Sequence, residues 1–197
     1  MTQAIIDNAA AISFDRDATV AQTVSASRNL KWFRKGPIQS LLEVQMNVVT
    51  RGVYQPILGV TSGSLVGPYT LQLPSEVVGV PVSEPVVVNV AGQAGNQITA
   101  MWQSSRSGNG GYTQGSIIQF SNHSQTYALT ADVVLDSLGI GTFFLDQPIA
   151  ESPTLTTTVV TGSAIQFSMN LINRPRASFG PTGLVNHDGP FVFAEVV

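Results

Sequence analysis

The most reactive combination of side chains lies in one short stretch, GSIIQFSNHSQTYALTADV (115–133). His123 stands between Ser121 and Ser124, and Asp132 follows nine residues later. A hydroxyl, an imidazole and a carboxylate are the components of a serine-hydrolase triad. Such a triad draws its members from separate elements that converge, whereas these residues lie along one predicted hairpin, and the chain has no G-x-S-x-G motif. We therefore interpret the stretch as a β-hairpin with a polar end, and His123 near its tip as a contact residue.

The remaining reactive groups also fail to form a constellation. His187, the second of two histidines, precedes Asp188 in VNHDGP, where Asn, Asp and Gly predict a turn. The absence of cysteine excludes disulfides, thiolate zinc sites and cysteine nucleophiles. The twelve acidic residues are scattered, and the glycine-rich runs lack the lysine and strand–helix context of a phosphate-binding loop. We expect a non-enzymatic chain without a catalytic residue, a metal or a cofactor.

The strongest local charge feature is RNLKWFRK (28–35), which holds four of the nine basic residues. Cations mixed with aromatic rings can bind single-stranded nucleic acid by stacking and phosphate contact. The formal net charge is −3, however, which favours the alternative that this segment docks on an acidic neighbour or protects a sheet edge. The predicted contact residues of this segment are Arg28, Lys31, Trp32, Phe33, Arg34 and Lys35.

A second predicted contact region is the polar, glycine-rich loop at 104–113. It contains Arg106 and Tyr112, and Trp102 lies just before it. Loops of this composition lie at the surface and carry binding residues. Trp32, Trp102, Tyr112 and Tyr127 offer rings that could stack on sugars. A carbohydrate-binding β-module is therefore the alternative function from a different class.

Composition favours a chain that is largely covered by neighbouring subunits over the alternative of an ordinary secreted β-protein. Hydrophobic residues make up 43% and are enough for a sizeable core. Charged residues make up only 11%, against roughly 25% in typical domains. A surface of amides and hydroxyls gives little repulsion between copies. The N-terminus has no basic region followed by an apolar run, and no window reaches the roughly 18 apolar residues of a membrane span. We expect synthesis in the cytoplasm without export.

Alternation with a period of two dominates the chain and predicts half-buried strands. The clearest runs place apolar residues at Leu42, Val44, Met46 and Val48, and at Ile165, Phe167, Met169 and Leu171. One helix or irregular crossover is predicted at 48–60, with Thr50 as its N-cap and Pro56 weakening it. The terminal run GPFVFAEVV predicts a last strand tied into a sheet. GSIIQF at Gly115 recurs as GSAIQF at Gly162, which indicates either two equivalent strand starts or a chance match.

These patterns predict a mainly β chain. We expect an antiparallel β-sandwich or barrel-like domain with one short helix and an extended N-terminal arm, which leaves room for a second small β-domain. The expected parts are an arm at 1–36, the first part of the core domain at 37–74, an inserted or second small β-domain at 75–160, and C-terminal strands completing the core at 161–197.

Five phrases follow one another in the chain: IQSLLEVQMNV, VVTRGVYQPILGV, PYTLQLP, the run from Gly115 to Ile149, and AIQFSMNLIN followed by FVFAEVV. In this order they resemble tail proteins of tailed bacteriophages, specifically distal-tail or baseplate-hub-like proteins of the type found in phages of aquatic bacteria. The resemblance spans about residues 25–197 and is one of layout and phrase. Ser116 stands where the family frequently has Asp, Ser121 where it has Gly, and Gln125 where it has Lys.

The resemblance implies a virion component assembled in the host cytoplasm. Such a protein forms a ring, expected to be sixfold, at the distal end of the tail and links the tail tube to hub, wedge or fibre proteins. The implied partners are copies of itself and other tail proteins, with no membrane and no nucleic acid except DNA passing through the lumen. A tail-tube or tail-terminator subunit is the alternative within the same class.

Overall fold

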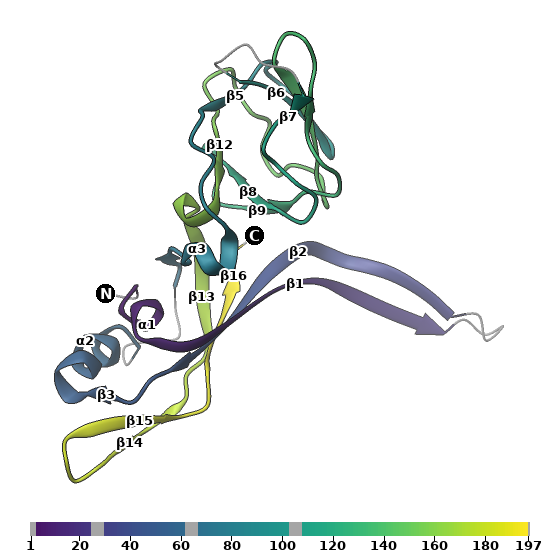
Figure 1. The fold of residues 1–197 in the computed structure, drawn as a ribbon. Coiled ribbons are helices and arrows are strands. Elements are labelled where there is room, and N and C mark those ends of the chain that lie inside the picture. Colours follow the sequence, from purple (N-terminus) through teal and green to yellow (C-terminus); the bar gives the residue numbers. More distant parts are fainter. Residues whose placement is uncertain (1–2, 25–29, 62–66, 103–107, 197) are drawn as a thin grey trace. The chain divides into compact units, whose positions relative to one another are not determined.

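The computed structural model describes residues 3–24, 30–61, 67–102 and 108–196 (Figure 1). Strands account for 46% of the chain and helices for 13%, and the sheets are antiparallel, which confirms the predicted mainly β, sandwich-like class. The chain forms two compact units. Unit 1 comprises Gln3–Pro68 and Met169–Val197, and unit 2 comprises Tyr69–Ser168. The expected second domain, 75–160, falls within unit 2, and the expected arm falls in unit 1.

Unit 1 is built from both ends of the chain. Its N-terminal elements are α1 (Gln3–Asp7), β1 (Ala9–Val24), β2 (Leu30–Met46), β3 (Val49–Thr50) and α2 (Arg51–Thr61). Its C-terminal elements are β13 (Phe167–Asn173), whose first two residues lie in unit 2, β14 (Arg176–Phe179), β15 (Leu184–Asp188) and β16 (Phe191–Glu195).

The main sheet of unit 1 runs in the order β1-β2-β16-β13, so the last strand lies between two others, as the terminal apolar run predicts. Phe191 is the cross-strand partner of Val44, and Phe193 is the partner of Leu42. These residues are buried, and Leu42, Val44 and Met46 alternate with less buried neighbours as expected. The alternation stops at Met46, because β2 ends there and Val48 is exposed. β14, β15 and β3 form a second, smaller sheet.

The N-terminal part is not an extended arm but half of a long β-hairpin. β1 pairs with β2 in antiparallel register from Ala9 opposite Met46 to Val24 opposite Leu30 (Figure 1). The register shifts between Ala18 and Val20. The sequence of β1, AAAISFDRDATVAQTV, mixes alanines and charged residues, so its alternation is too weak to reveal a strand by itself. Its partner is supplied by residues farther along the chain.

Three α-helices occur among the described residues, where the sequence predicts one. The predicted helix is α2, which begins directly after Thr50, contains Pro56, and buries Tyr54 and Ile57. The two unpredicted helices are α1, which buries Ile5 and Ile6, and α3, which has four residues. Helices this short cover less than the 11-residue window over which a 3.6-residue period becomes detectable.

Unit 2 carries the remaining strands. They are β4 (Tyr69–Leu71), β5 (Val86–Val88), β6 (Gln97–Trp102), β7 (Gly108–Asn109), β8 (Ile117–Phe120), β9 (Thr126–Ala128), β10 (Val134–Leu135), β11 (Ile140–Phe144) and β12 (Val159–Thr161). The helices of this unit are α3 (Ser75–Val78) and a 3-10 turn at Gly162–Ala164.

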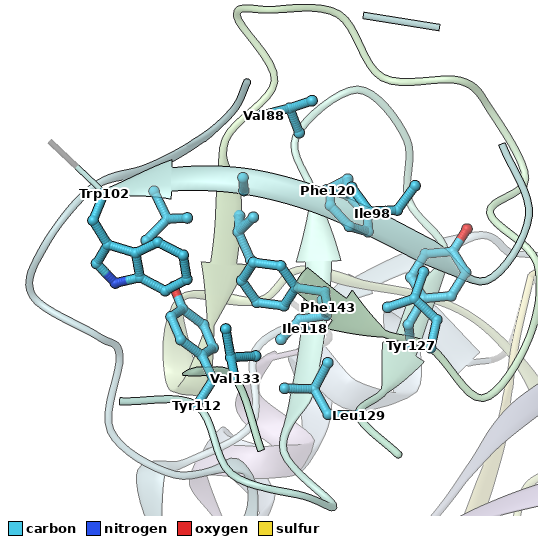
Figure 2. Packing of buried hydrophobic residues seen from close by; sticks show 14 of the residues in the cluster. Val88, Ile98, Trp102, Tyr112, Ile118, Phe120, Tyr127, Leu129, Val133 and Phe143 are labelled. Atoms are coloured by element: carbon cyan, nitrogen blue, oxygen red, sulfur yellow. The ribbon is translucent and has the colours of Figure 1, made fainter. Parts of the chain in front are cut away.

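Two sheets of unit 2 share one hydrophobic core. One sheet has the order β5-β6-β11-β10-β7 and the other has the order β12-β8-β9. Phe143 of the first sheet and Phe120 of the second belong to the same buried cluster (Figure 2). In this cluster the Trp102 and Phe143 rings stack with centroids 5.7 Å apart, and Tyr112 meets both rings edge-on. Side chains from two sheets that fill one core are the arrangement of a β-sandwich.

The two copies of the repeated hexapeptide do not begin equivalent strands. After Gly115 the chain enters β8 at Ile117, whereas after Gly162 it makes a 3-10 turn and β13 begins only at Phe167. The copies meet through their glutamines. The Gln119 amide nitrogen donates to the Gln166 carbonyl oxygen at 2.9 Å, and its carbonyl oxygen accepts the Gln166 backbone N–H at 3.2 Å.

Candidate functional site

The basic and aromatic contact residues lie in the part of the β1–β2 hairpin that is distant from β16. Lys31, Trp32, Phe33 and Arg34 are partners of Thr23, Gln22, Ala21 and Val20, respectively. Lys35 also belongs to β2. Arg28 and Arg106 lie outside the described residues. The structure therefore assigns five of the six residues predicted for this segment to one strand of a hairpin.

At one end of the hairpin, β16 pairs with β2 and adds a third strand, whereas at the other end β1 and β2 form a two-stranded ribbon. β16 pairs with β2 from Leu41 to Val44, and the pairing with β1 continues without it to Leu30. An isolated two-stranded ribbon is at best marginally stable in water. Each of its outer edges presents backbone N–H and C=O groups that a further strand can pair with. The ribbon at 17–24 and 30–38, which we call the hairpin ribbon, is therefore a natural place for contact with another protein.

A polar groove surrounds His123 in unit 2. Its volume is about 460 Å³, and its lining consists of hydroxyl, amide, imidazole and small apolar groups from Thr70, Gln119, Ser121, Asn122, His123, Ser124, Val160, Ala164, Gln166 and Ser168. His123 lies in the turn between β8 and β9, so the predicted hairpin tip is confirmed. The lining contains no aspartate, glutamate, lysine or arginine. The groove therefore suits a neutral, hydrogen-bonding surface.

Hydrogen bonds determine the tautomer of His123. Its Nδ1 lies 3.1 Å from Oδ1 of Asn122, which can only accept, so Nδ1 carries the proton. Its Nε2 lies 2.8 Å from the Tyr127 hydroxyl, which accepts the Ala150 backbone N–H, also at 2.8 Å. Because Nδ1 carries the proton, Nε2 is the acceptor, and the hydroxyl donates to it in preference to Gln125 Oε1, which lies farther away at 3.4 Å. Burial lowers the pKa of His123, and the negative charge of Glu151 partly opposes this shift. The imidazole is thus held neutral in one orientation.

The structure does not bring the triad candidates together. Asp132 accepts the Gln114 backbone N–H at 2.7 Å and lines a different pocket from His123. Ser121 Oγ accepts the Thr158 backbone N–H at 2.9 Å. Both ring nitrogens of His123 are engaged by Asn122 and Tyr127, so the imidazole has no nitrogen directed at a serine hydroxyl. These bonds give His123 the role of an ordering group at the end of a hairpin.

Trp102 and Tyr112 are core residues, which removes them from the predicted contact set. Each is only 2% exposed, and Trp102 Nε1 donates to the Gly110 carbonyl oxygen at 3.2 Å. Burial and the negative charge of Glu84 both raise the pKa of the Tyr112 phenol. Tyr127 is fully buried as well. An aromatic ring and a polar loop are adjacent in the sequence, but only the packing of two sheets decides that the rings point inward.

His187 is a buried group whose environment the sequence does not reveal. The predicted turn is wrong, because His187 lies within β15, where it is the partner of Ala177 in β14. The ring is 4% exposed and lies 5.4 Å from the rings of both Tyr54 and Phe191. Neither ring nitrogen has a hydrogen-bond partner among the described residues, and burial lowers the pKa of the imidazole. Val185 and His187 stand two residues apart, which is the spacing of one strand face, and both are buried in β15. This spacing is the sequence signal for the placement of His187.

The described part of the chain contains no group of three or more histidine, cysteine or acidic residues that could hold a metal ion. It also contains no helix long and apolar enough to cross a membrane. Comparison with models of known protein families gives no match, and comparison with curated proteins gives none either.

Proposed function

We propose that this chain is a structural subunit of a bacteriophage tail or baseplate, and that copies of it form a ring at the distal end of the tail. The ring links the tail tube to hub, wedge or fibre proteins, and the subunit has no enzymatic role. The resemblance in sequence layout motivates the choice of a tail protein. The observation that carries the assembly role is the hairpin ribbon, which extends beyond the pairing with β16.

The ribbon supports assembly for a thermodynamic reason. Two strands paired only with each other bury little apolar surface, so ordering them costs conformational entropy that few contacts offset. Contact with a neighbouring subunit would cover the ribbon and pair its edges. When each copy offers the same ribbon and the same receiving surface, a rotation can close the assembly into a ring. The low charge of the chain, 11% of residues, lowers the repulsion between copies.

A variant without the ribbon tests this function. Asp17 and Gln39 are cross-strand partners, so residues 18–38 can be replaced by an Asn-Gly turn. We expect the wild-type chain to form a closed oligomer over a wide range of concentration, and the variant to be monomeric. Light scattering after size-exclusion chromatography measures both masses. Circular dichroism checks that the variant is folded.

The outcome also separates the related functions. Isolated rings in negative-stain images support a distal-tail subunit, whereas stacked tubes support the tail-tube alternative. A wild-type chain that stays monomeric at high concentration and is missing from virions contradicts the proposal.

Carbohydrate binding has lost most of its support. Three of the four rings considered for it, those of Trp102, Tyr112 and Tyr127, are buried, and nothing is described of the Trp32 side chain. In the lining of the polar groove, the imidazole of His123 is the one aromatic ring.

A further inference from the structure

One outer face of unit 2 combines exposed apolar side chains with two carboxylates. We call it the acidic–apolar patch, and it consists of Asp132, Val134, Asp136, Ile140, Thr142 and Phe144, which line a pocket of about 420 Å³. Val134 is 69% exposed and Phe144 is 37% exposed. Apolar side chains gathered in one exposed pocket with a polar rim are typical of an interaction surface.

Strand geometry explains why these residues share a face. In β11, Ile140, Thr142 and Phe144 alternate with the buried Gly141 and Phe143, so the first three point away from the core. In β10, Val134 is exposed and Leu135 is buried. Because Leu135 is the partner of Gly141, the outward residues of the two strands lie side by side.

The two carboxylates are held in place by backbone N–H groups. Asp132 Oδ1 accepts the Gln114 N–H at 2.7 Å. Asp136 Oδ1 accepts the N–H groups of Leu138 and Ile140 at 2.8 and 2.9 Å. These bonds use one oxygen of each carboxylate and fix the direction of the other. A partner cation therefore meets charges that are already ordered, which lowers the entropy cost of binding.

The chain contains a segment of complementary chemistry in β2. The patch has an acid, an apolar residue and an acid at every second position, Asp132, Val134 and Asp136. β2 has a cation, an aromatic residue and a cation at the same spacing, Lys31, Phe33 and Lys35. In a fully extended segment, residues at this spacing share one face, and in β2 the register against β1 shifts between Arg34 and Ile38, directly after Phe33 and Arg34. The segment also lies in the hairpin ribbon, for which the described part of the chain supplies no third strand.

We propose that the acidic–apolar patch of one copy receives residues 31–35 of β2 from a second copy. This inference rests on the proposed assembly function and names the surface through which it works. Lysine ammonium groups meet the two carboxylates, while the aromatic residue covers the apolar side chains between them. Opposite charges set the register and speed the encounter, and the buried apolar area supplies most of the affinity.

A peptide of residues 28–36 tests the pairing without requiring a ring. It is titrated onto the full chain and followed by calorimetry or by NMR shifts of the patch residues. We expect binding to weaken by about tenfold in Asp132→Asn/Asp136→Asn, whose amide oxygens still accept the backbone bonds but carry no charge. Val134→Lys should weaken binding at least as much. A control, Glu76→Gln/Asp188→Asn, removes two exposed acids outside the patch and should bind as the wild type does.

Assembly of the full chain provides the second measurement. We expect Asp132→Asn/Asp136→Asn and Lys31→Glu/Lys35→Glu each to weaken the oligomer, and raised salt to weaken the wild type. Mixing the two variants should restore partial association, because each mixed pair has one intact contact. Restoration requires contact between copies and contradicts docking of the segment on its own chain.

The outcomes for the two proposals are distinct. If the wild type assembles but the patch variants assemble equally well and the peptide does not bind, the docking proposal is overturned and the assembly function stands. If the wild type is monomeric while the peptide binds and the patch variants abolish this binding, the assembly function falls and the pairing of segment and patch is retained. Equal binding of the peptide to the wild type and to the patch variants overturns the pairing itself.

Discussion

The two histidines illustrate how differently one residue type can be used at the residue scale. Burial lowers the pKa of both imidazoles. His123 is bonded at both nitrogens and is fixed in one tautomer by Asn122 and Tyr127. His187 lies between aromatic rings with no partner for either nitrogen among the described residues. His123 holds a polar turn together through its two hydrogen bonds, whereas His187 places two polar nitrogens without hydrogen bonds to the described residues in an apolar core.

We expect His187→Phe to stabilise the chain at pH 7 by about 1 kcal/mol, because it removes two buried nitrogens that lack hydrogen bonds and keeps a ring beside Tyr54 and Phe191. Urea unfolding measures the change in the free energy of unfolding. A loss of stability would contradict this reading and would indicate that the imidazole has a partner.

The pH dependence of stability follows from the direction of the same shift. Burial places the folded pKa of His187 below the ordinary value of 6.5, so between these two pKa values the unfolded chain binds a proton that the folded chain does not. Stability is therefore complete above pH 6.5 and falls as the pH drops towards the folded pKa, with a slope of at most about 1.4 kcal/mol per pH unit for this group. His187→Phe should reduce the slope, and His123, whose pKa burial also lowers, contributes to the part that remains.

Tyr127→Phe tests the assigned tautomer of His123. The change removes the hydroxyl that donates to Nε2 and accepts from the Ala150 N–H. We expect a loss of about 1–2 kcal/mol of stability and a rise of the His123 pKa towards its ordinary value, because the lost bond favours the neutral ring. Nitrogen chemical shifts across a pH titration report both the tautomer and the pKa. An unchanged pKa would mean that the hydroxyl does not donate to this ring.

At the element scale, local alternation determines where strands form. Tertiary contacts determine which structure each copy of a repeated sequence adopts. Leu42, Val44 and Met46 were predictable as one buried face because each position is decided by its immediate neighbours. The repeated hexapeptide shows the opposite. Gly115 lies in the turn that the Ser116 N–H closes on the Thr113 carbonyl oxygen, where a Cβ would meet no atom within 4 Å. A Cβ on Gly162 would lie 2.5 Å from the Gly79 carbonyl oxygen and 2.6 Å from the Pro81 nitrogen.

This contrast predicts unequal effects of the same substitution. Gly162→Ala should destabilise unit 2 by more than about 2 kcal/mol, because the methyl group would collide with backbone that cannot rotate away. Gly115→Ala should cost only about 1–2 kcal/mol, the penalty of a positive φ, since no atom lies within 4 Å of its Cβ. Thermal unfolding of the two variants gives the comparison. Equal effects would show that strain at positive φ, and not the collision, dominates at Gly162.

At the scale of the whole molecule, the chain divides into a continuous unit and a discontinuous one. The buried cluster of unit 2 lies entirely between Val86 and Val159, within Tyr69–Ser168. Unit 1 needs residues from both ends, because β16 pairs with both β2 and β13. A segment that contains its whole core should fold without the rest of the chain.

We expect the fragment 69–168 to fold by itself. It contains Trp102 but not Trp32, so its tryptophan emission reports on one ring that is 2% exposed in the intact chain. Blue-shifted emission and a cooperative urea transition are the expected results, and Trp102→Ala should lower the stability of the fragment by about 3–5 kcal/mol. Emission typical of a solvent-exposed ring would contradict independent folding. The converse fragment, 1–68, should not fold, because it lacks β16 and β13.

The sequence by itself determined the mainly β class, the position of α2, the alternating faces of β2 and β13, and a hairpin whose tip carries His123. These features depend on neighbours a few residues apart, so period and turn chemistry are enough to predict them. Only the tertiary structure decided that β1 pairs with β2, that Trp102 and Tyr112 point into a shared core, and that His187 is buried in a strand. It also decided that Asp132 joins Val134 and Phe144 in an outer patch and lines a separate pocket from His123. These outcomes depend on which distant strands become neighbours, and hydrophobic burial, which is non-directional, does not encode that choice in any local pattern.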